Sequence, residues 1–380
     1  MVMKKALIVS STGGFLSQFL ENDVQVLQEK GYEIHYASDF DNPVYEFNPE
    51  ALRNEGIIMH QIVMHKKPWH LIKNTKGLIQ LSELINKEDI CLVHCHNPVG
   101  GMLGRLSGFC SGRHPYVIYT SHGFHFFKGA PKSYWLIFYP IERFLARFTD
   151  MIITINKEDY KRACGFKLRK GGHVELLHGV GLDTKRFHPM PEKRDAVRKE
   201  LGIPKNGFHI VTAAELNNNK NQMAVIEAIR ELDDENIYYS ICGRGGKYKE
   251  LKSFVKTNGM AGNIKLLGYR KDMERVLQSA DVFAFPSKRE GFGMAAVEAL
   301  SCAVPVIAAD NRGTREYMKN GENGIVCRAE DIKDYERAIV TIKNNSDIRE
   351  AYSKKALELS ADFSKEKSKE TMREIYSKIV

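Results

Sequence analysis

Short apolar runs alternate with amphipathic stretches along the first half of the chain. The apolar runs have the length of β-strands and fall at residues 5–10, 33–37, 90–96, 116–121 and 151–156. Between them lie segments in which apolar residues recur with the spacing of a helix. One is residues 15–30, which Gly31 ends. Apolar strands separated by helices are typical of a parallel sheet that is covered by helices on both faces.

The same alternation restarts after about residue 187. Strands are predicted at 208–214, 237–243, 264–268, 281–286 and 304–309, and helices at 222–232, 247–258, 272–280 and 293–302. A chain of 380 residues is also too long for one ordinary core. We therefore predict two doubly wound α/β domains, residues 1–185 and 186–363, joined by a segment rich in glycine and proline. We expect them to face each other across a cleft that holds the ligand at the carboxyl ends of the strands.

Composition excludes several classes of protein and indicates the cellular compartment. The apolar fraction of 43% and the charged fraction of 27% exclude collagen-like, disordered and coiled-coil chains. No window holds the ~18 apolar residues of a membrane span, and the first apolar run is too short for a signal peptide. Seven scattered cysteines favour reduced thiols. We expect a cytoplasmic protein.

Positive charge is concentrated in residues 60–186, which hold 19 Lys and Arg against 9 Asp and Glu, whereas the net charge of the whole chain is +9. Two segments there, 64–73 and 125–148, combine cations with aromatic residues and contain both tryptophans, Trp69 and Trp135. This mix predicts peripheral docking on an anionic membrane surface, on the inner face of the cell membrane. The alternative is an amphipathic core helix with its rings packed inward. No nucleic-acid-binding motif is present, so we expect no nucleic acid partner.

Two segments look like metal sites. Cys91, His94, Cys95 and His96 lie on one predicted strand, where successive side chains point to opposite faces, so the four cannot converge on zinc. The Asp-Phe-Asp of residues 39–41 follows a strand of a doubly wound domain and is interpreted as a loop. We predict no metal site.

Residues 286–300 give the clearest indication of a binding site. A strand ends near Phe285, and a turn with glycines opens a helix near Gly293. The free amides and the positive end of such a helix favour an anion such as a diphosphate. Glu290 and Glu298 are suited to accept hydrogen bonds from hydroxyls of a sugar and a ribose; the alternative is a solvated loop residue and a helix-surface residue.

The spacing of Glu290 and Glu298, with seven residues between them, resembles the signature of family-4 retaining glycosyltransferases of the GT-B fold. Residues 177–189, 304–316 and 320–326 are similar to further signatures of that family, in the same order. The likeness covers nearly the whole chain and resembles bacterial members that build capsule or exopolysaccharide. It implies that the last helix, 364–380, packs back on the N-terminal domain.

The resemblance implies a role for each matching residue. Glu290 would contact the donor sugar near the reacting centre, Lys220 would neutralise the diphosphate leaving group, and His122 would line the acceptor side. The implied donor-binding residues are Glu298, Gly291, Phe292, Gly293, Met294, Tyr269, Arg270, Gly13 and Gly14. The chain departs from the family at Glu215, where arginine is common, and at Arg244, where an acidic residue is common. We interpret this as a charge swap, in which Arg244 restores positive charge near the phosphates and also binds the donor.

The resemblance therefore implies a metal-independent hexosyltransferase without a cofactor. It would transfer a sugar with retention from a nucleotide donor, expected to be UDP-linked, to a lipid-linked or glycan acceptor. The N-terminal domain would bind the acceptor and the C-terminal domain the donor. Two alternatives stay open: a nucleotide-sugar epimerase of the same fold, and a non-catalytic protein that binds a nucleotide sugar or nucleic acid.

Overall fold

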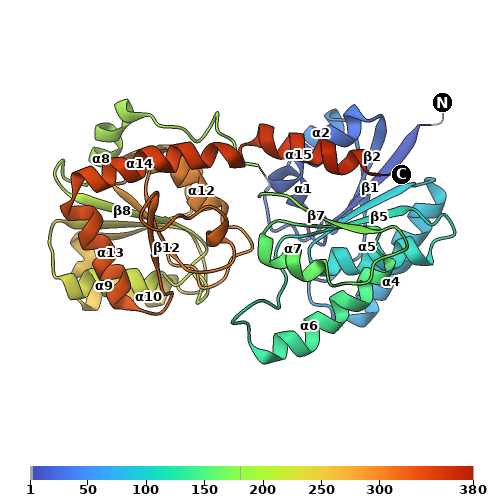
Figure 1. The fold of residues 1–380 in the computed structure, drawn as a ribbon, viewed down its shortest axis with the longest axis horizontal. Coiled ribbons are helices and arrows are strands. Elements are labelled where there is room, and N and C mark those ends of the chain that lie inside the picture. Colours follow the sequence, from blue (N-terminus) through green and yellow to red (C-terminus); the bar gives the residue numbers. More distant parts are fainter. Residues whose placement is uncertain (1–2, 180, 380) are drawn as a thin grey trace. The chain divides into compact units, whose positions relative to one another are not determined.

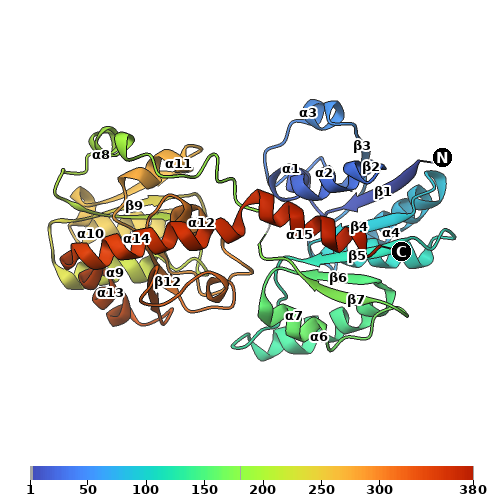
Figure 2. The same ribbon diagram turned by 45° about the horizontal axis from the view of Figure 1, so that its top comes forward.

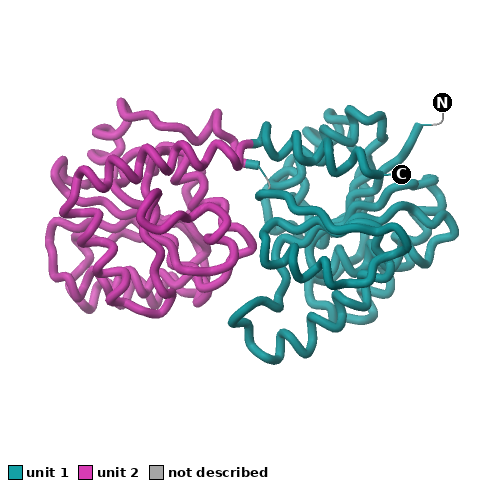
Figure 3. Tube along the Cα trace, viewed as in Figure 1, with its two compact units in different colours: residues 1–181, 365–380 teal, residues 182–364 magenta. Residues whose placement is uncertain are grey.

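The computed structural model describes residues 3–179 and 181–379. The chain folds into two compact units (Figure 3). Unit 1 is built from the chain up to residue 181 together with residues from 365 onward, and unit 2 comprises residues 182–364. The chain therefore passes from one unit to the other four residues before the boundary expected from the sequence, and its last helix belongs to unit 1.

Unit 1 is built on a parallel sheet of seven strands (Figure 1). The strands are β1 (Lys4–Val9), β2 (Tyr32–Ser38), β3 (Ile57–Gln61), β4 (Leu92–His96), β5 (Tyr116–Ser121), β6 (Met151–Thr154) and β7 (His173–Leu176). Their spatial order is β3-β2-β1-β4-β5-β6-β7. The order reverses between β1 and β4, so the loops that follow these two strands border the crevice where ligands of such sheets bind.

Helices cover both faces of this sheet. They are α1 (Phe15–Phe19), α2 (Glu21–Glu29), α3 (Pro49–Asn54), α4 (Leu71–Lys87), α5 (Pro98–Cys110), α6 (Lys132–Leu145), α7 (Lys157–Ala163) and α15 (Lys365–Ser377). One apolar core contains residues of α1, α2 and α15, and the other contains residues of α4 and α5 (Figure 2). The single helix expected over residues 15–30 is wrong, because Leu20 takes a non-helical conformation (φ −119°) that separates α1 from α2, and its side chain is buried in the core.

The returning helix α15 is fixed to α2 by charges and by a buried contact. Lys369 and Arg373 pair with Glu29 at 2.9 and 3.0 Å, and these two cations lower the pKa of Glu29 to about 2. The Tyr376 side chain is buried, and its hydroxyl donates to Asp23. The chain's last turns therefore complete the core of unit 1.

Unit 2 repeats the architecture with six parallel strands. They are β8 (Phe208–Ala213), β9 (Ile237–Cys242), β10 (Ile264–Gly268), β11 (Val282–Phe285), β12 (Val306–Ala309) and β13 (Gly324–Cys327), in the order β10-β9-β8-β11-β12-β13. The helices are α8 (Arg194–Leu201), α9 (Gln222–Leu232), α10 (Tyr248–Thr257), α11 (Met273–Val276), α12 (Met294–Ser301), α13 (Ile332–Asn344) and α14 (Ser346–Ser360). Here the strand order reverses between β8 and β11. In the described residues, the longest and most apolar helices fall short of what spanning a bilayer requires.

Candidate active site

The loop after β11 opens α12 at the point of unit 2 where the strand order reverses. Gly293 precedes the helix with φ 103°, a conformation that side chains other than glycine rarely adopt. A Cβ on this residue would lie 2.7 Å from the Phe285 ring and 2.8 Å from the Tyr317 hydroxyl. Gly293 and Met294 are partly exposed. The first amides of α12 are therefore presented at a surface that glycine alone allows to form.

Lys220 and Glu290 meet beside this helix start. The Lys220 ammonium lies 2.5 Å from Glu290 Oε1, and the two side chains are 22% and 12% exposed. Asn217 Oδ1 accepts hydrogen bonds from the amides of Asn219 and Lys220, and Lys288 N donates to the Asn219 carbonyl at 2.8 Å. Hydrogen bonds thus join the loop after β8 to the loop after β11. Lys220 and Glu290, which were predicted separately, form one ion pair.

Two neighbours of Glu290 fix the backbone of its loop. Arg312 Nε donates to the Glu290 carbonyl at 3.2 Å, and the Arg312 side chain is 8% exposed. Gly313 lies against the same loop, with its Cβ position 2.7 Å from the Phe292 carbonyl oxygen. Arg312 was not among the residues predicted from the sequence, where its one signal was its place in the stretch 304–316 that resembles a family signature.

Glu298 lies one turn into α12 and is partly buried. Burial raises the pKa of its carboxyl to about 7; Arg186 opposes this shift and Glu274 adds to it. Near neutral pH the group is close to half-protonated, so it can either accept or donate a hydrogen bond to a hydroxyl.

Arg244 and Tyr269 lie together at the ends of neighbouring strands. The Arg244 guanidinium lies 5.6 Å from the centre of the Tyr269 ring, and Tyr269 is 57% exposed. Leu216 N donates to the Arg244 carbonyl at 2.9 Å, which joins this loop to the one that carries Lys220. The interpretation of Glu215 and Arg244 as a charge swap, with Arg244 near the donor phosphates, stays a prediction.

The Arg270 side chain is engaged by neighbouring carboxylates. Its guanidinium binds Asp272 at 2.7 and 2.8 Å and Glu200 at 3.1 Å. These carboxylates raise its pKa. The Arg270 side chain is thus occupied by a surface ion-pair network, and a contribution to donor binding would have to come from its backbone.

In unit 1, Gly13 and Gly14 form the loop after β1. Gly14 has φ 81°, and a Cβ there would collide with the Tyr45 carbonyl. Gly13 N donates to the Asp39 carbonyl at 2.9 Å. The segment that begins at Asp39 supports this loop as an irregular stretch, in agreement with the interpretation of residues 39–41.

His122 follows β5 and contacts His96, which ends β4. Nε2 of His122 lies 3.3 Å from Nδ1 of His96, and the Phe15 ring packs edge-on at 5.1 Å from the His122 ring. Burial lowers the pKa of His122 to about 4. The imidazole is therefore neutral at physiological pH.

A buried polar cluster lies behind this pair. Ligand atoms of Asp23, His94 and His96 lie within 4.8 Å of one another, the arrangement of three possible metal ligands. Both nitrogens of His94 already have partners, Thr120 Oγ1 at 2.7 Å and the Tyr376 hydroxyl at 2.8 Å. A hydrogen-bond network therefore accounts for His94. As the strand alternation predicts, Cys95 packs in the core on the opposite face of the sheet, and Cys91 is exposed. The sequence did not indicate Asp23.

The two cationic aromatic segments differ in structure. Trp69, Leu71 and Ile72 are 67%, 71% and 89% exposed at the start of α4. On α6 the rings of Trp135, Phe138 and Tyr139 pack into the core, while the outer face exposes apolar side chains. Those exposed side chains are Leu136 (77%), Ile137 (53%), Ile141 (41%) and Phe144 (50%).

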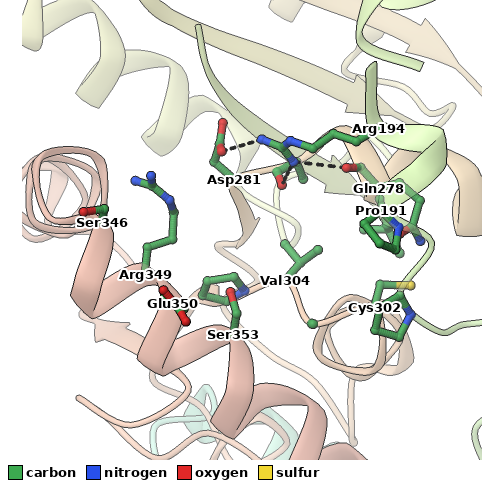
Figure 4. Close-up of a pocket in the computed structure, with 15 residues that line it drawn as sticks. Pro191, Arg194, Gln278, Asp281, Cys302, Val304, Ser346, Arg349, Glu350 and Ser353 are labelled. Carbon is green, nitrogen blue, oxygen red and sulfur yellow. Dashed lines mark hydrogen bonds and ion pairs between the residues drawn. The ribbon is translucent and has the colours of Figure 1, made fainter. Parts of the chain in front are cut away.

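A pocket of ≈ 490 Å³ opens in unit 2 at the opposite end of α12 (Figure 4). Its walls include Cys302, Val304 and Arg194, and Arg194 is bound to Asp281 at 2.6 Å. No predicted site residue lines it. Volume alone therefore does not mark the candidate site, which we define by the loops after β8 and β11.

Comparison with known proteins identifies both halves of the chain. Residues 193–359 match the family described as Glycosyl transferases group 1, and residues 6–156 match the family described as Glycosyl transferase 4-like. A glycosyltransferase named EpsD from Bacillus subtilis is 37% identical over 302 residues, which cover 78% of this chain and 79% of the relative. The UDP-Gal:alpha-D-GlcNAc-diphosphoundecaprenol alpha-1,3-galactosyltransferase of Escherichia coli is 31% identical over 72% of each chain.

Solved structures share the fold. The crystal structure of Anabaena HepE in complex with UDP matches with a TM-score of 0.81 and 18% identity, covering 99% of this chain and 100% of HepE. WaaG, a glycosyltransferase involved in lipopolysaccharide biosynthesis, matches with a TM-score of 0.75 and 14% identity, covering 98% of this chain and 100% of WaaG. The predicted GT-B architecture of two doubly wound domains is confirmed.

Proposed function

The chain belongs to the group 1 glycosyl transferases of the GT-B fold, and on this premise we propose that it transfers a sugar from a UDP-linked donor to a lipid-linked acceptor in polysaccharide biosynthesis. The name of the E. coli relative, which specifies both a UDP-linked donor and a diphosphoundecaprenol acceptor, supports this choice. HepE, which has the same fold, was crystallised with UDP. The observation that carries the proposal is the Lys220–Glu290 pair beside the exposed start of α12.

The chemistry follows from the charges of these groups. When the glycosidic bond to the diphosphate breaks, negative charge grows on the leaving group and positive charge on the sugar ring. Lys220, freed from Glu290 when the donor binds, would neutralise the diphosphate together with the amides of α12. Glu290 would then accept hydrogen bonds from the sugar. We further propose that this positive charge, with Arg244 nearby, suffices without a metal ion.

A donor panel and a transfer assay test the proposal. The full-length protein is screened by thermal shift against UDP- and GDP-sugars, since a ligand at 100 times its Kd stabilises a protein by about 2.7 kcal/mol. The stabilising donor is then supplied with lipid-diphosphate-linked sugars, with and without EDTA. We expect a UDP-sugar, transfer that resists EDTA, and loss of transfer in Glu290→Gln but not in the control Glu358→Gln, whose side chain is exposed on α14. Transfer that survives Glu290→Gln would refute the site.

The epimerase alternative gives a different result in the same assay. An epimerase interconverts the donor with no acceptor present, whereas a transferase needs an acceptor for turnover. Incubation of the selected donor with enzyme alone therefore separates the two reactions.

We also propose that unit 1 docks on an anionic membrane to reach such an acceptor. The outer face of α6 combines Leu136, Ile137 and Phe144 with exposed Arg143, and Arg147 is exposed in the turn that follows the helix. Apolar side chains that enter the headgroup region and cations that meet anionic lipid give this type of binding. The second contact would be the exposed start of α4 around Trp69.

Vesicle sedimentation tests the docking. We expect binding to vesicles with anionic lipid, weak binding to zwitterionic vesicles, and a decrease with salt. Leu136→Ser with Ile137→Ser should weaken binding, whereas Leu357→Ser, an exposed apolar residue of α14 in unit 2, should not. Equal loss in both variants would contradict the assignment to α6.

A further inference from the structure

His94 lies in a series of hydrogen bonds that begins at Asp23 and runs through Tyr376. Because Asp23 accepts a hydrogen bond, it sets the direction of the others. The Tyr376 hydroxyl donates to Asp23 Oδ1 at 3.0 Å. Its oxygen is then the acceptor for the proton on His94 Nδ1, 2.8 Å away. His94 Nε2 carries no proton in that state and accepts from the Thr120 hydroxyl at 2.7 Å. All hydrogen-bonding positions of this imidazole are therefore used.

The His96 ring lies against the His94 ring at a tilt of 41°, and His94 makes its hydrogen bonds to Tyr376 and Thr120. The two ring centres are 4.2 Å apart, and His96 is completely buried. Nδ1 of His96 lies 3.3 Å from Nε2 of His122, whereas Nε2 of His96 is buried with no hydrogen-bond partner within the described residues. Burial and the neighbouring imidazoles lower the pKa of His96, so it is neutral and carries one proton only.

Two arrangements of that proton are possible. If it sits on Nε2, a buried N–H is left without an acceptor, and His122 must donate. If it sits on Nδ1, it is used in the bond to His122, and only a lone pair is left without a partner. Buried N–H groups without an acceptor are rare, and buried acceptors without a donor are less so. The second arrangement is therefore favoured.

We propose that His96 is a positioning residue that donates from Nδ1 to Nε2 of His122 and so holds His122 in the tautomer protonated on Nδ1. No hydrogen bond to Nδ1 of His122 occurs in the part of the chain that the structure describes. His122 then offers an N–H to an oxygen of the bound substrate, either a hydroxyl or a phosphate oxygen. His122 thus acts as a hydrogen-bond donor, and it does not remove a proton from the hydroxyl of the acceptor substrate. This assignment rests on the proposed function together with the acceptor-side role that the family resemblance implies for His122.

Nitrogen NMR of the imidazoles tests the proposal directly. The full-length protein with ¹⁵N-labelled histidine is measured near pH 7.5 without substrate, and His122 is assigned by comparison with His122→Gln. We expect Nδ1 of His122 to be protonated and Nε2 to be bare. The opposite tautomer in the wild-type protein would overturn the proposal. Because no substrate is present, this result is independent of whether the proposed donor and acceptor are correct.

The variants His96→Asn and His96→Gln distinguish a role of His96 in orienting His122 from a role in packing alone. An asparagine amide can place its N–H close to the position of Nδ1, whereas a glutamine amide reaches the position of Nε2. We expect His96→Asn to keep the His122 tautomer and most of kcat. His96→Gln should lose the tautomer and lower kcat about tenfold with little change in the donor KM, at a similar melting temperature. If both variants keep the tautomer and kcat, His96 has no positioning role.

Discussion

The Glu298 carboxyl gives the sharpest quantitative prediction, for the variant Glu298→Gln. Burial raises its pKa from 4.5 to about 7. An acid with a raised pKa in the folded state binds its proton more tightly there than in the unfolded chain, so stability falls as the pH rises from about 4.5 to about 7. The difference between a pKa of 4.5 and one of about 7 corresponds to about 3 kcal/mol. Glutamine removes this penalty.

The assay must report on unit 2. Both tryptophans, Trp69 and Trp135, lie in unit 1, so tryptophan fluorescence would follow the wrong unit. Hydrogen exchange of peptides from β11 and α12 in urea, read by mass spectrometry, reports the opening of unit 2 itself. Comparing variants at each pH cancels the intrinsic exchange rate.

We expect the stability advantage of Glu298→Gln over the wild-type protein to be near zero at pH 4. It should grow to about 3 kcal/mol at pH 8, with the change centred between pH 4.5 and 7. Glu358→Gln, on the exposed side of α14, should show no such rise. Parallel pH curves for Glu298→Gln and the wild-type protein would refute the argument that burial controls this carboxyl.

Three further changes test other parts of the site and fold. Lys220→Ala should lower kcat about 10²–10³-fold through loss of leaving-group stabilisation, and Lys220→Arg should recover part of it, in a steady-state transfer assay. Gly293→Ala should destabilise unit 2 by about 1–3 kcal/mol, because of its positive φ and the contact with Phe285, and should weaken donor binding in calorimetry. Tyr376→Phe should cost about 1–3 kcal/mol, because the buried Asp23 loses its donor, and should speed hydrogen exchange in α15; unchanged exchange would contradict this.

The sequence predicted the features that depend on local pattern. Uniformly apolar runs gave the central strands of both sheets because parallel strands are buried on both faces. The same reasoning missed β3 (Ile57–Gln61), an edge strand in which only Ile57 is buried, and β7, in which every residue is partly exposed. The glycine turn placed the start of α12 correctly.

Features that join distant parts of the chain left no local signal. Lys220 and Glu290 are 70 residues apart, and Asp23 and Tyr376 are 353 residues apart. Both pairs form because the topology brings loops or helices together, the first at neighbouring strand ends and the second on one face of the sheet. A resemblance could assign roles to Lys220 and Glu290 singly, but it could not say that they bind each other in the free protein.

Helix α6 is the segment for which the sequence pattern left two interpretations open, an inward-packed core helix and a membrane-docking surface. Its residues are apolar around most of the circumference, which in a soluble protein is typical of a fully buried helix. Only one side is covered: Trp135 and Tyr139 pack inward, whereas Leu136 and Ile137 face outward at 77% and 53% exposure. Burying those outer side chains would be favourable, because each buried aliphatic side chain contributes about 1.5–3 kcal/mol. The inward rings therefore account for the packing of α6, and the outward aliphatic residues are the ones on which the proposed membrane docking depends.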